Sequence, residues 1–194
     1  MQKDDLVLVY LLMSVDGNVS AEEDNQFDEL LKQSGFSEAK NTVIGKAKDI
    51  LSSVEAEMND SQNWLEGLHK KYKSQLENDC SNNSGYLLNF VLGNRRSKAE
   101  YKELLWAMVN MAMIDNDFSE NEKKFIGCCC KDWNVEDSLL EEMIEIAKTL
   151  YSLYSHLDLL KSINRSYGEI EPLVNELNAN KAVLEENLKD LISA

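Results

Sequence analysis

The sequence contains little proline and glycine and has no long apolar run. Its 194 residues include one proline and eight glycines, so few positions would interrupt a helix. Alternating β-branched runs bounded by turn pairs, the pattern of strands, are missing. The longest apolar run near the N-terminus covers residues 6–13, whereas a membrane-spanning helix needs about 20 residues. These absences argue against a sheet and a membrane span, and they predict an all-α protein.

Basic residues are also scarce. Twenty Lys and Arg stand against 35 Asp and Glu, which gives a net charge of −15. This charge opposes binding to nucleic acid or anionic lipid through a general electrostatic field. Cations and basic protein surfaces are the expected counterparts. The N-terminal residues carry no cleavage pattern of a signal peptide, so we expect a cytoplasmic protein.

Catalytic motifs are missing as well. Three of the four cysteines are consecutive, at 128–130, which does not suit a disulfide framework. The two histidines, His69 and His156, show no zinc spacing with them. No glycine-rich phosphate loop, nucleophile elbow or acid–base pair is evident. We therefore expect no enzyme, although an exposed Cys128 would leave thiol chemistry open.

An internal duplication is the clearest positive feature. A shift of 99 residues aligns apolar with apolar positions for some thirty residues without a gap, and repeats of this kind indicate duplicated supersecondary units. Aligned pairs include Leu6 with Leu105, Val9 with Met108, Leu12 with Met111, Ser20 with Ser119, Glu23 with Glu122, Phe27 with Ile126, Leu30 with Cys129 and Leu31 with Cys130. Each copy, around 3–38 and 102–137, is predicted to form helix, acidic turn and helix, and Gly35 should end the second helix of the first copy.

The negative charge gathers around the two turns. Residues 1–39 hold two Lys and nine Asp or Glu, net −7, and residues 115–145 hold three Lys and ten Asp or Glu, also net −7. Residues 40–114 have a net charge of +1 and residues 146–194 of −2. Any function of the charge should therefore be sought at the turns.

Each turn is followed by an S-x-x-E capping box, Ser20–Glu23 and Ser119–Glu122. In such a box the serine oxygen accepts the amide of the third helical residue, and the glutamate accepts the serine amide. The Asp, Asn and Gly before the boxes are ordinary turn residues. Helix capping alone is thus one complete interpretation of the motif.

A divalent-cation site is the other interpretation. Capping leaves surplus oxygen ligands at Asp16, Asn18, Asp115 and Asp117. Such oxygens suit Ca²⁺ or Mg²⁺. Neither turn is an EF-hand loop, because in the second copy Glu120 stands where glycine is needed and Ile126 where glutamate is needed. A cation site would have to assemble from both turns, brought together by a pseudo-twofold.

The two turn motifs resemble the tellurite-resistance TerB-like family. The match is Met13-Ser-Val-Asp-Gly-Asn-Val-Ser-Ala-Glu-Glu23, repeated as Met113-Ile-Asp-Asn-Asp-Phe-Ser-Glu-Asn-Glu122 with Asn116 where glycine is usual. The resemblance covers residues 1–150. It implies a bundle of about seven helices and a non-enzymatic acidic module of stress-response complexes. Related modules accompany J-domain co-chaperones and defence systems. It also implies metal binding at Asp16, Glu23, Asp115 and Glu122.

Taken together, the sequence predicts an all-α compact bundle of about seven to eight helices with an internal pseudo-twofold repeat, plus a C-terminal amphipathic helix. The bundle domain would span 1–168 and the helix 169–194. That helix carries a heptad seam with a lysine at one core position. The seam is formed by Ile170, Val174, Leu177, Lys181, Leu184, Leu188 and Leu191. It could dock on the bundle, form a homodimer through 170–191 or pair with a partner helix.

We expect a protein partner, which could belong to a membrane-associated complex. The alternative function is a structural adaptor without metal that uses an apolar groove or the C-terminal helix.

Overall fold

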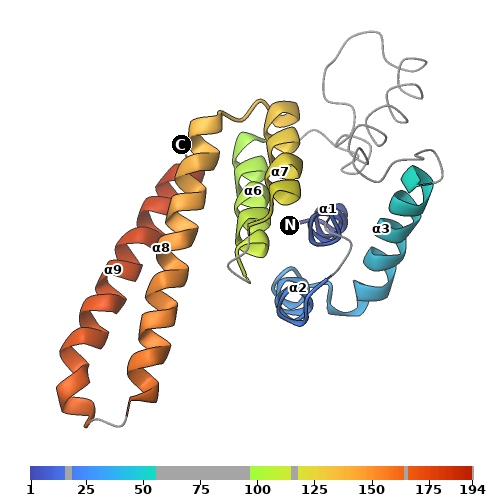
Figure 1. Ribbon diagram of the computed structural model, residues 1–194. Helices are drawn as coiled ribbons and strands as arrows, with labels where there is room; N and C mark the ends of the chain where they lie inside the picture. The colour runs from blue at the N-terminus through green and yellow to red at the C-terminus, as the bar shows by residue number, and fades with distance from the viewer. Residues whose placement is uncertain (16–18, 56–96, 115–117, 164–165, 194) are drawn as a thin grey trace. The chain divides into compact units, whose positions relative to one another are not determined.

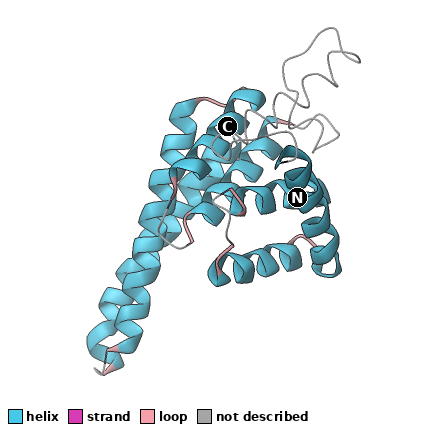
Figure 2. Ribbon diagram, turned by 45° about the vertical axis from the view of Figure 1, so that its right-hand side comes forward, coloured by secondary structure: helices cyan, strands magenta, loops and turns pink. Residues whose placement is uncertain are grey.

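The computed structural model describes residues 1–15, 19–55, 97–114, 118–163 and 166–193. These residues form seven α-helices and a short 3₁₀ turn, and none of them lies in a strand (Figure 2). The all-α prediction is confirmed. The part of the predicted bundle within residues 56–96 lies outside the described residues. Among the described helices, none combines the length and the apolar character needed to cross a membrane.

The described residues group into two units, Met1–Glu136 and Asp137–Ala194. The first contains α1 (Lys3–Met13), α2 (Ala21–Gln33), η1 (Ser37–Ala39), α3 (Lys40–Glu55), α6 (Lys98–Ala112) and α7 (Glu120–Trp133). The second contains α8 (Asp137–Ser162) and α9 (Tyr167–Ser193). The sequence placed a boundary at 168/169, whereas the packing places it at 136/137. The reason is that α8 packs along α9 and so belongs with it.

Helix α1 is the centre of the first unit. It contacts α2, α3, α6 and α7 (Figure 1). Every residue from Leu6 to Met13 is buried, so the helix is covered on all sides, as expected of a helix that is apolar all round. Asp4 and Asp5 lie in its first turn, where negative charge is favourable beside the helix N-terminus.

Helices α2 and α7 end in the same way at positions 99 residues apart. Gly35 and Asn134 both adopt left-handed backbone geometry, with φ of 76° and 53°. The residue after each donates its amide to a carbonyl five residues back, Phe36 to Leu31 and Val135 to Cys130, both at 2.8 Å. This is the Schellman end, for which glycine and asparagine are the favoured residues. The two ends match in the predicted register of 99 residues, while the internal repeat and its pseudo-twofold stay predictions.

The second unit is a helical hairpin in which α8 and α9 lie side by side (Figures 1 and 2). The predicted seam is the buried side of α9: Leu188 is buried and the other six seam residues are partly buried. Lys181, the polar seam residue, lies over the ring of Tyr154 on α8, with Nζ 4.9 Å from the ring centroid. This cation–π contact explains how a lysine is accommodated at a core position. The predicted amphipathic C-terminal helix is confirmed, and its role in oligomerisation stays a prediction.

Candidate functional site

The two predicted capping boxes form as the sequence indicates. The Ser20 amide donates to Glu23 Oε2 at 2.7 Å, and the Glu23 amide donates to Ser20 Oγ at 3.1 Å. The second box has distances of 2.8 and 3.2 Å for the same bonds between Ser119 and Glu122. Glu23 and Glu122 are only 7% and 6% exposed. Each of these two predicted metal ligands therefore has one carboxylate oxygen that accepts a hydrogen bond from a serine amide.

The remaining four predicted ligands, Asp16, Asn18, Asp115 and Asp117, lie outside the described residues. Within the part of the chain that the structure describes, no group of three or more His, Cys, Asp or Glu is placed to hold a metal ion. The cation hypothesis therefore depends on the turn residues themselves, because Glu23 and Glu122 are already used as caps.

Ion pairs take up part of the acidic surplus of the first copy. Lys40 Nζ lies 2.8 Å from Asp24 Oδ1 and 2.7 Å from Asp28 Oδ1, which ties α2 to the start of α3. Burial lowers the pKa of Lys40, but its hydrogen bonds to the two carboxylates outweigh this and leave the pKa raised. Asp24 is not needed for capping, and the bridge to Lys40 supplies its structural role.

The same group of charges affects the pKa of Tyr10. Burial is the largest cause that raises the pKa of Tyr10, and the nearby Asp24 raises it further. Lys40 acts in the opposite direction. Tyr10 is therefore a neutral phenol near two carboxylates that are paired with Lys40.

The second copy shows a similar local compensation. Lys123 Nζ lies 2.8 Å from Glu120 Oε1, and this hydrogen bond is the largest cause that lowers the pKa of Glu120. Cys129 and Cys130 are buried, as expected from their alignment with Leu30 and Leu31. The side chain of Cys128 lies outside the described ones, so its predicted exposure stays a prediction.

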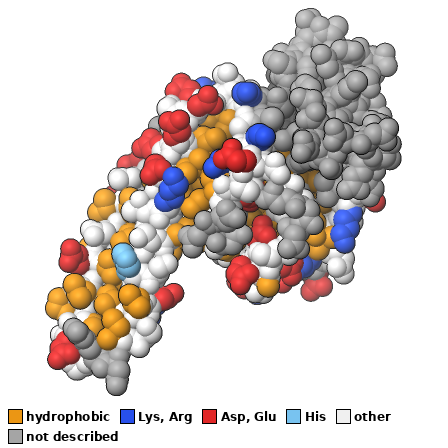
Figure 3. All heavy atoms as spheres, viewed as in Figure 1, with side chains coloured by type: hydrophobic (Ala, Val, Ile, Leu, Met, Phe, Trp, Pro, Cys, Tyr) orange, Lys and Arg blue, Asp and Glu red, His pale blue; other side chains and the backbone are white. Residues whose placement is uncertain are grey.

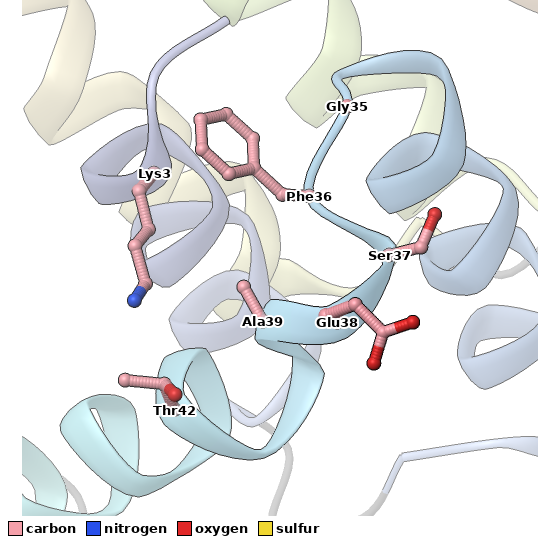
Figure 4. A pocket seen from close by; sticks show the side chains of 7 residues that line it. All are labelled: Lys3, Gly35, Phe36, Ser37, Glu38, Ala39 and Thr42. Carbon is pink, nitrogen blue, oxygen red and sulfur yellow. The ribbon is translucent and has the colours of Figure 1, made fainter.

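An open pocket of about 370 Å³ lies between the start of α1 and the α2–α3 connection. It is lined by Lys3, Gly35, Phe36, Ser37, Glu38, Ala39 and Thr42. In Figure 4 the side chains of Lys3, Phe36 and Thr42 flank the hollow, whereas those of Ser37 and Glu38 point away from it. One ammonium, one hydroxyl and one aromatic ring do not make an acid–base or nucleophilic arrangement. The pocket therefore carries no argument for catalysis.

The hairpin exposes more apolar surface than its own packing needs. Among described residues, the large hydrophobic side chains that are exposed are Met1, Tyr154, Leu159, Ile163, Leu173 and Val183, and all but Met1 belong to the second unit. Leu159, Ile163 and Leu173 are 59%, 37% and 51% exposed and lie near the connection between α8 and α9. We call these three residues the apolar tip. Figure 3 shows apolar side chains gathered over this end of the hairpin.

The apolar tip was not predicted from the sequence. On the same hairpin, Tyr154 is 41% exposed, and Lys181 lies over its ring. Leu159 and Ile163, four residues apart, would have been a usable signal, because that spacing places two side chains on one helix face. In the structure Leu159 lies on α8 and Ile163 directly follows the helix, and both are exposed, whereas Leu150 and Leu157 are buried.

Comparisons with protein-family models, with curated proteins and with solved structures find no match to this chain. The TerB-like resemblance therefore stays a prediction that rests on the two turn motifs, and the geometry of the chain itself must carry any functional conclusion.

Proposed function

We propose that this chain is a non-enzymatic interaction module whose hairpin recruits a protein partner. The observation that carries the proposal is the concentration of exposed large apolar side chains on the second unit. Exposed apolar patches on a water-soluble surface are typical of sites that bind other proteins. The heptad seam already supplies the contacts of α9 with α8, so the apolar tip is surplus to the stability of the hairpin.

Differential capture tests the proposal. The full chain, a Leu159→Gln/Ile163→Gln/Leu173→Gln variant and a Val183→Gln variant would be crosslinked to their neighbours in the same cells. Val183 is the matched control because it is also on the hairpin and 57% exposed, but it lies outside the apolar tip. Glutamine is a good helix former, so all variants should keep their helices.

The expected result is a partner that the full chain and the Val183 variant capture equally and the triple variant loses by at least about tenfold, since three apolar contacts are removed. Circular dichroism should show the same helix content for all three proteins. A triple variant that captures the same set of proteins in the same amounts would contradict the proposal.

Cation binding at the duplicated turns is a second candidate function. It is favoured by the charge of −7 around each turn and by the resemblance to the TerB-like family, which implies an acidic module of stress-response complexes. The proposed ligands are Asp16, Asn18, Asp115 and Asp117, because Glu23 and Glu122 each give an oxygen to a serine amide.

Adding Ca²⁺ or Mg²⁺ should then raise the melting temperature by about 3 °C when the ion is in about tenfold excess over its Kd, because binding only to the folded state stabilises it. Chelation with EDTA should reverse the rise, and an Asp16→Asn/Asp115→Asn variant should not show it. Potassium chloride of equal ionic strength controls for screening of the acidic surface. Superimposable thermal scans with and without the divalent ion would remove this candidate.

A further inference from the structure

The three residues of the apolar tip lie at one end of the hairpin. Leu159 lies three residues before the end of α8, and Leu173 is the seventh residue of α9. At a rise of 1.5 Å per residue, these positions are about 5 and 9 Å from the connected ends of their helices. Ile163 immediately follows α8. The three side chains thus present apolar surface from both helices at one end of the hairpin.

Exposed acidic residues lie near the apolar tip. Asp158 on α8 and Glu169 and Glu171 on α9 are exposed, and they lie at the same end of the hairpin as the apolar tip. Lys161 Nζ is 3.1 Å from Asp158 Oδ1, so this cation already pairs within its own helix. Over residues 137–194 there are eleven Asp or Glu and five Lys or Arg, a net charge of −6. An occupant of the apolar tip therefore meets exposed carboxylates at this end and a unit of net negative charge.

Charge selects among the possible occupants. A second copy of the chain would bring a unit of net charge −6 against another of the same charge, and like charges across an interface oppose association. An anionic lipid surface is opposed for the same reason. A helix with apolar residues on one face and Lys or Arg beside them can pack against the apolar side chains and form ion pairs with the carboxylates.

We propose that the apolar tip of the hairpin, Leu159, Ile163 and Leu173, binds a basic amphipathic helix of a partner protein. The apolar face of that helix covers the three side chains, and its basic residues face Asp158, Glu169 and Glu171. This inference rests on the proposed interaction function and adds the chemical class of the partner. The carboxylates speed the encounter and set the orientation, whereas the apolar side chains hold the complex together.

A designed probe tests the inference without knowledge of the natural partner. The probe is a fluorescent peptide of about four helical turns, with leucines at i, i+3, i+4 and i+7 and lysines flanking them. A second peptide has glutamate in place of each lysine, and a third has the first composition in scrambled order. Fluorescence anisotropy is measured with the full chain, with the triple glutamine variant of the apolar tip and with Val183→Gln.

The basic helical peptide should bind the full chain and the Val183 variant with the same Kd. The Kd should be at least about tenfold weaker with the triple variant, and it should weaken severalfold when salt is raised from low to physiological concentration. The acidic and scrambled peptides should bind at least about tenfold more weakly than the basic one. Equal binding of the basic peptide to the full chain and the triple variant would overturn the inference, because general charge attraction would then explain it.

The same set of proteins can show whether the apolar tip instead binds a second copy of the chain or a lipid surface. Light scattering that gives twice the monomer mass for the full chain, but the monomer mass for the triple variant, would assign the apolar tip to a second copy. Sedimentation with neutral phosphatidylcholine vesicles that is lost in the triple variant would assign it to a lipid surface. Either result overturns the basic-helix inference. If a partner is captured through the apolar tip but the basic peptide does not bind, the proposed function stands and only the inference fails.

Discussion

Replacement of Phe27 by alanine is expected to lower the free energy of unfolding of the Met1–Glu136 unit by about 3–5 kcal/mol. Phe27 on α2 has no exposed surface. Its ring packs against that of Tyr10 on α1, with centroids 5.5 Å apart and planes inclined by 54°. Alanine would lose the aromatic contact and leave a cavity against the central helix, and both effects add to the loss.

Urea unfolding followed by tryptophan fluorescence measures this effect. Trp106 and Trp133 lie in helices of the first unit, and the sequence after residue 136 contains no tryptophan, so the signal does not report the hairpin. Phe118→Ala is the matched control, because Phe118 is only partly buried and its ring lies 5.7 Å from Lys123 Nζ. This control should cost no more than about 1 kcal/mol. Equal losses for the two variants would contradict the buried position of Phe27.

The features that the sequence predicted well are local in the chain. The capping boxes at Ser20 and Ser119 depend only on a serine and a glutamate three residues apart, the spacing at which the two residues exchange hydrogen bonds at a helix N-terminus. Gly35 could be assigned to a helix end because glycine adopts positive φ without steric cost. Asn134 could have been assigned in the same way, since it aligns with Gly35 and asparagine is the next residue to accept left-handed geometry.

The features that the sequence did not predict depend on contacts between helices. The bridge from Lys40 to Asp24 and Asp28 requires the approach angle of α3 to α2, which no periodicity encodes. The packing of α8 on α9 was not predicted for the same reason, because the apolar stripe of α8 is compatible with a bundle or with a hairpin. The outward face of Leu159 also depends on which stripe of α8 becomes the buried one.

The capping glutamates give the second large effect. Glu23→Ala together with Glu122→Ala should lower the free energy of unfolding of the first unit by about 2–4 kcal/mol, because each variant leaves a partly buried serine amide without its acceptor at a cost of about 1–2 kcal/mol. The two boxes lie on different helices, so their losses should add. Glu100→Ala is the matched control. Glu100 accepts the Ser97 amide at 2.8 Å in the same geometry, but it is exposed, and water can replace its oxygen at a cost of about 0.5 kcal/mol.

Glutamine at the same two positions separates capping from cation binding. The Glu23→Gln/Glu122→Gln protein keeps a side-chain oxygen that can accept the serine amide but loses two negative charges. If the residues act as caps, this protein should recover most of the stability that the alanine variant loses, less about 0.3–1 kcal/mol per site from the weaker interaction with the helix N-terminus. Its thermal response to Ca²⁺ or Mg²⁺ should match that of the unchanged chain, because the proposed ligands are the turn residues.

If the glutamine protein is as unstable as the alanine protein in EDTA, the hydrogen bond is not what Glu23 and Glu122 contribute. If it is stable but its cation response is lost, the two carboxylates are ligands as well as caps, as the family resemblance implies.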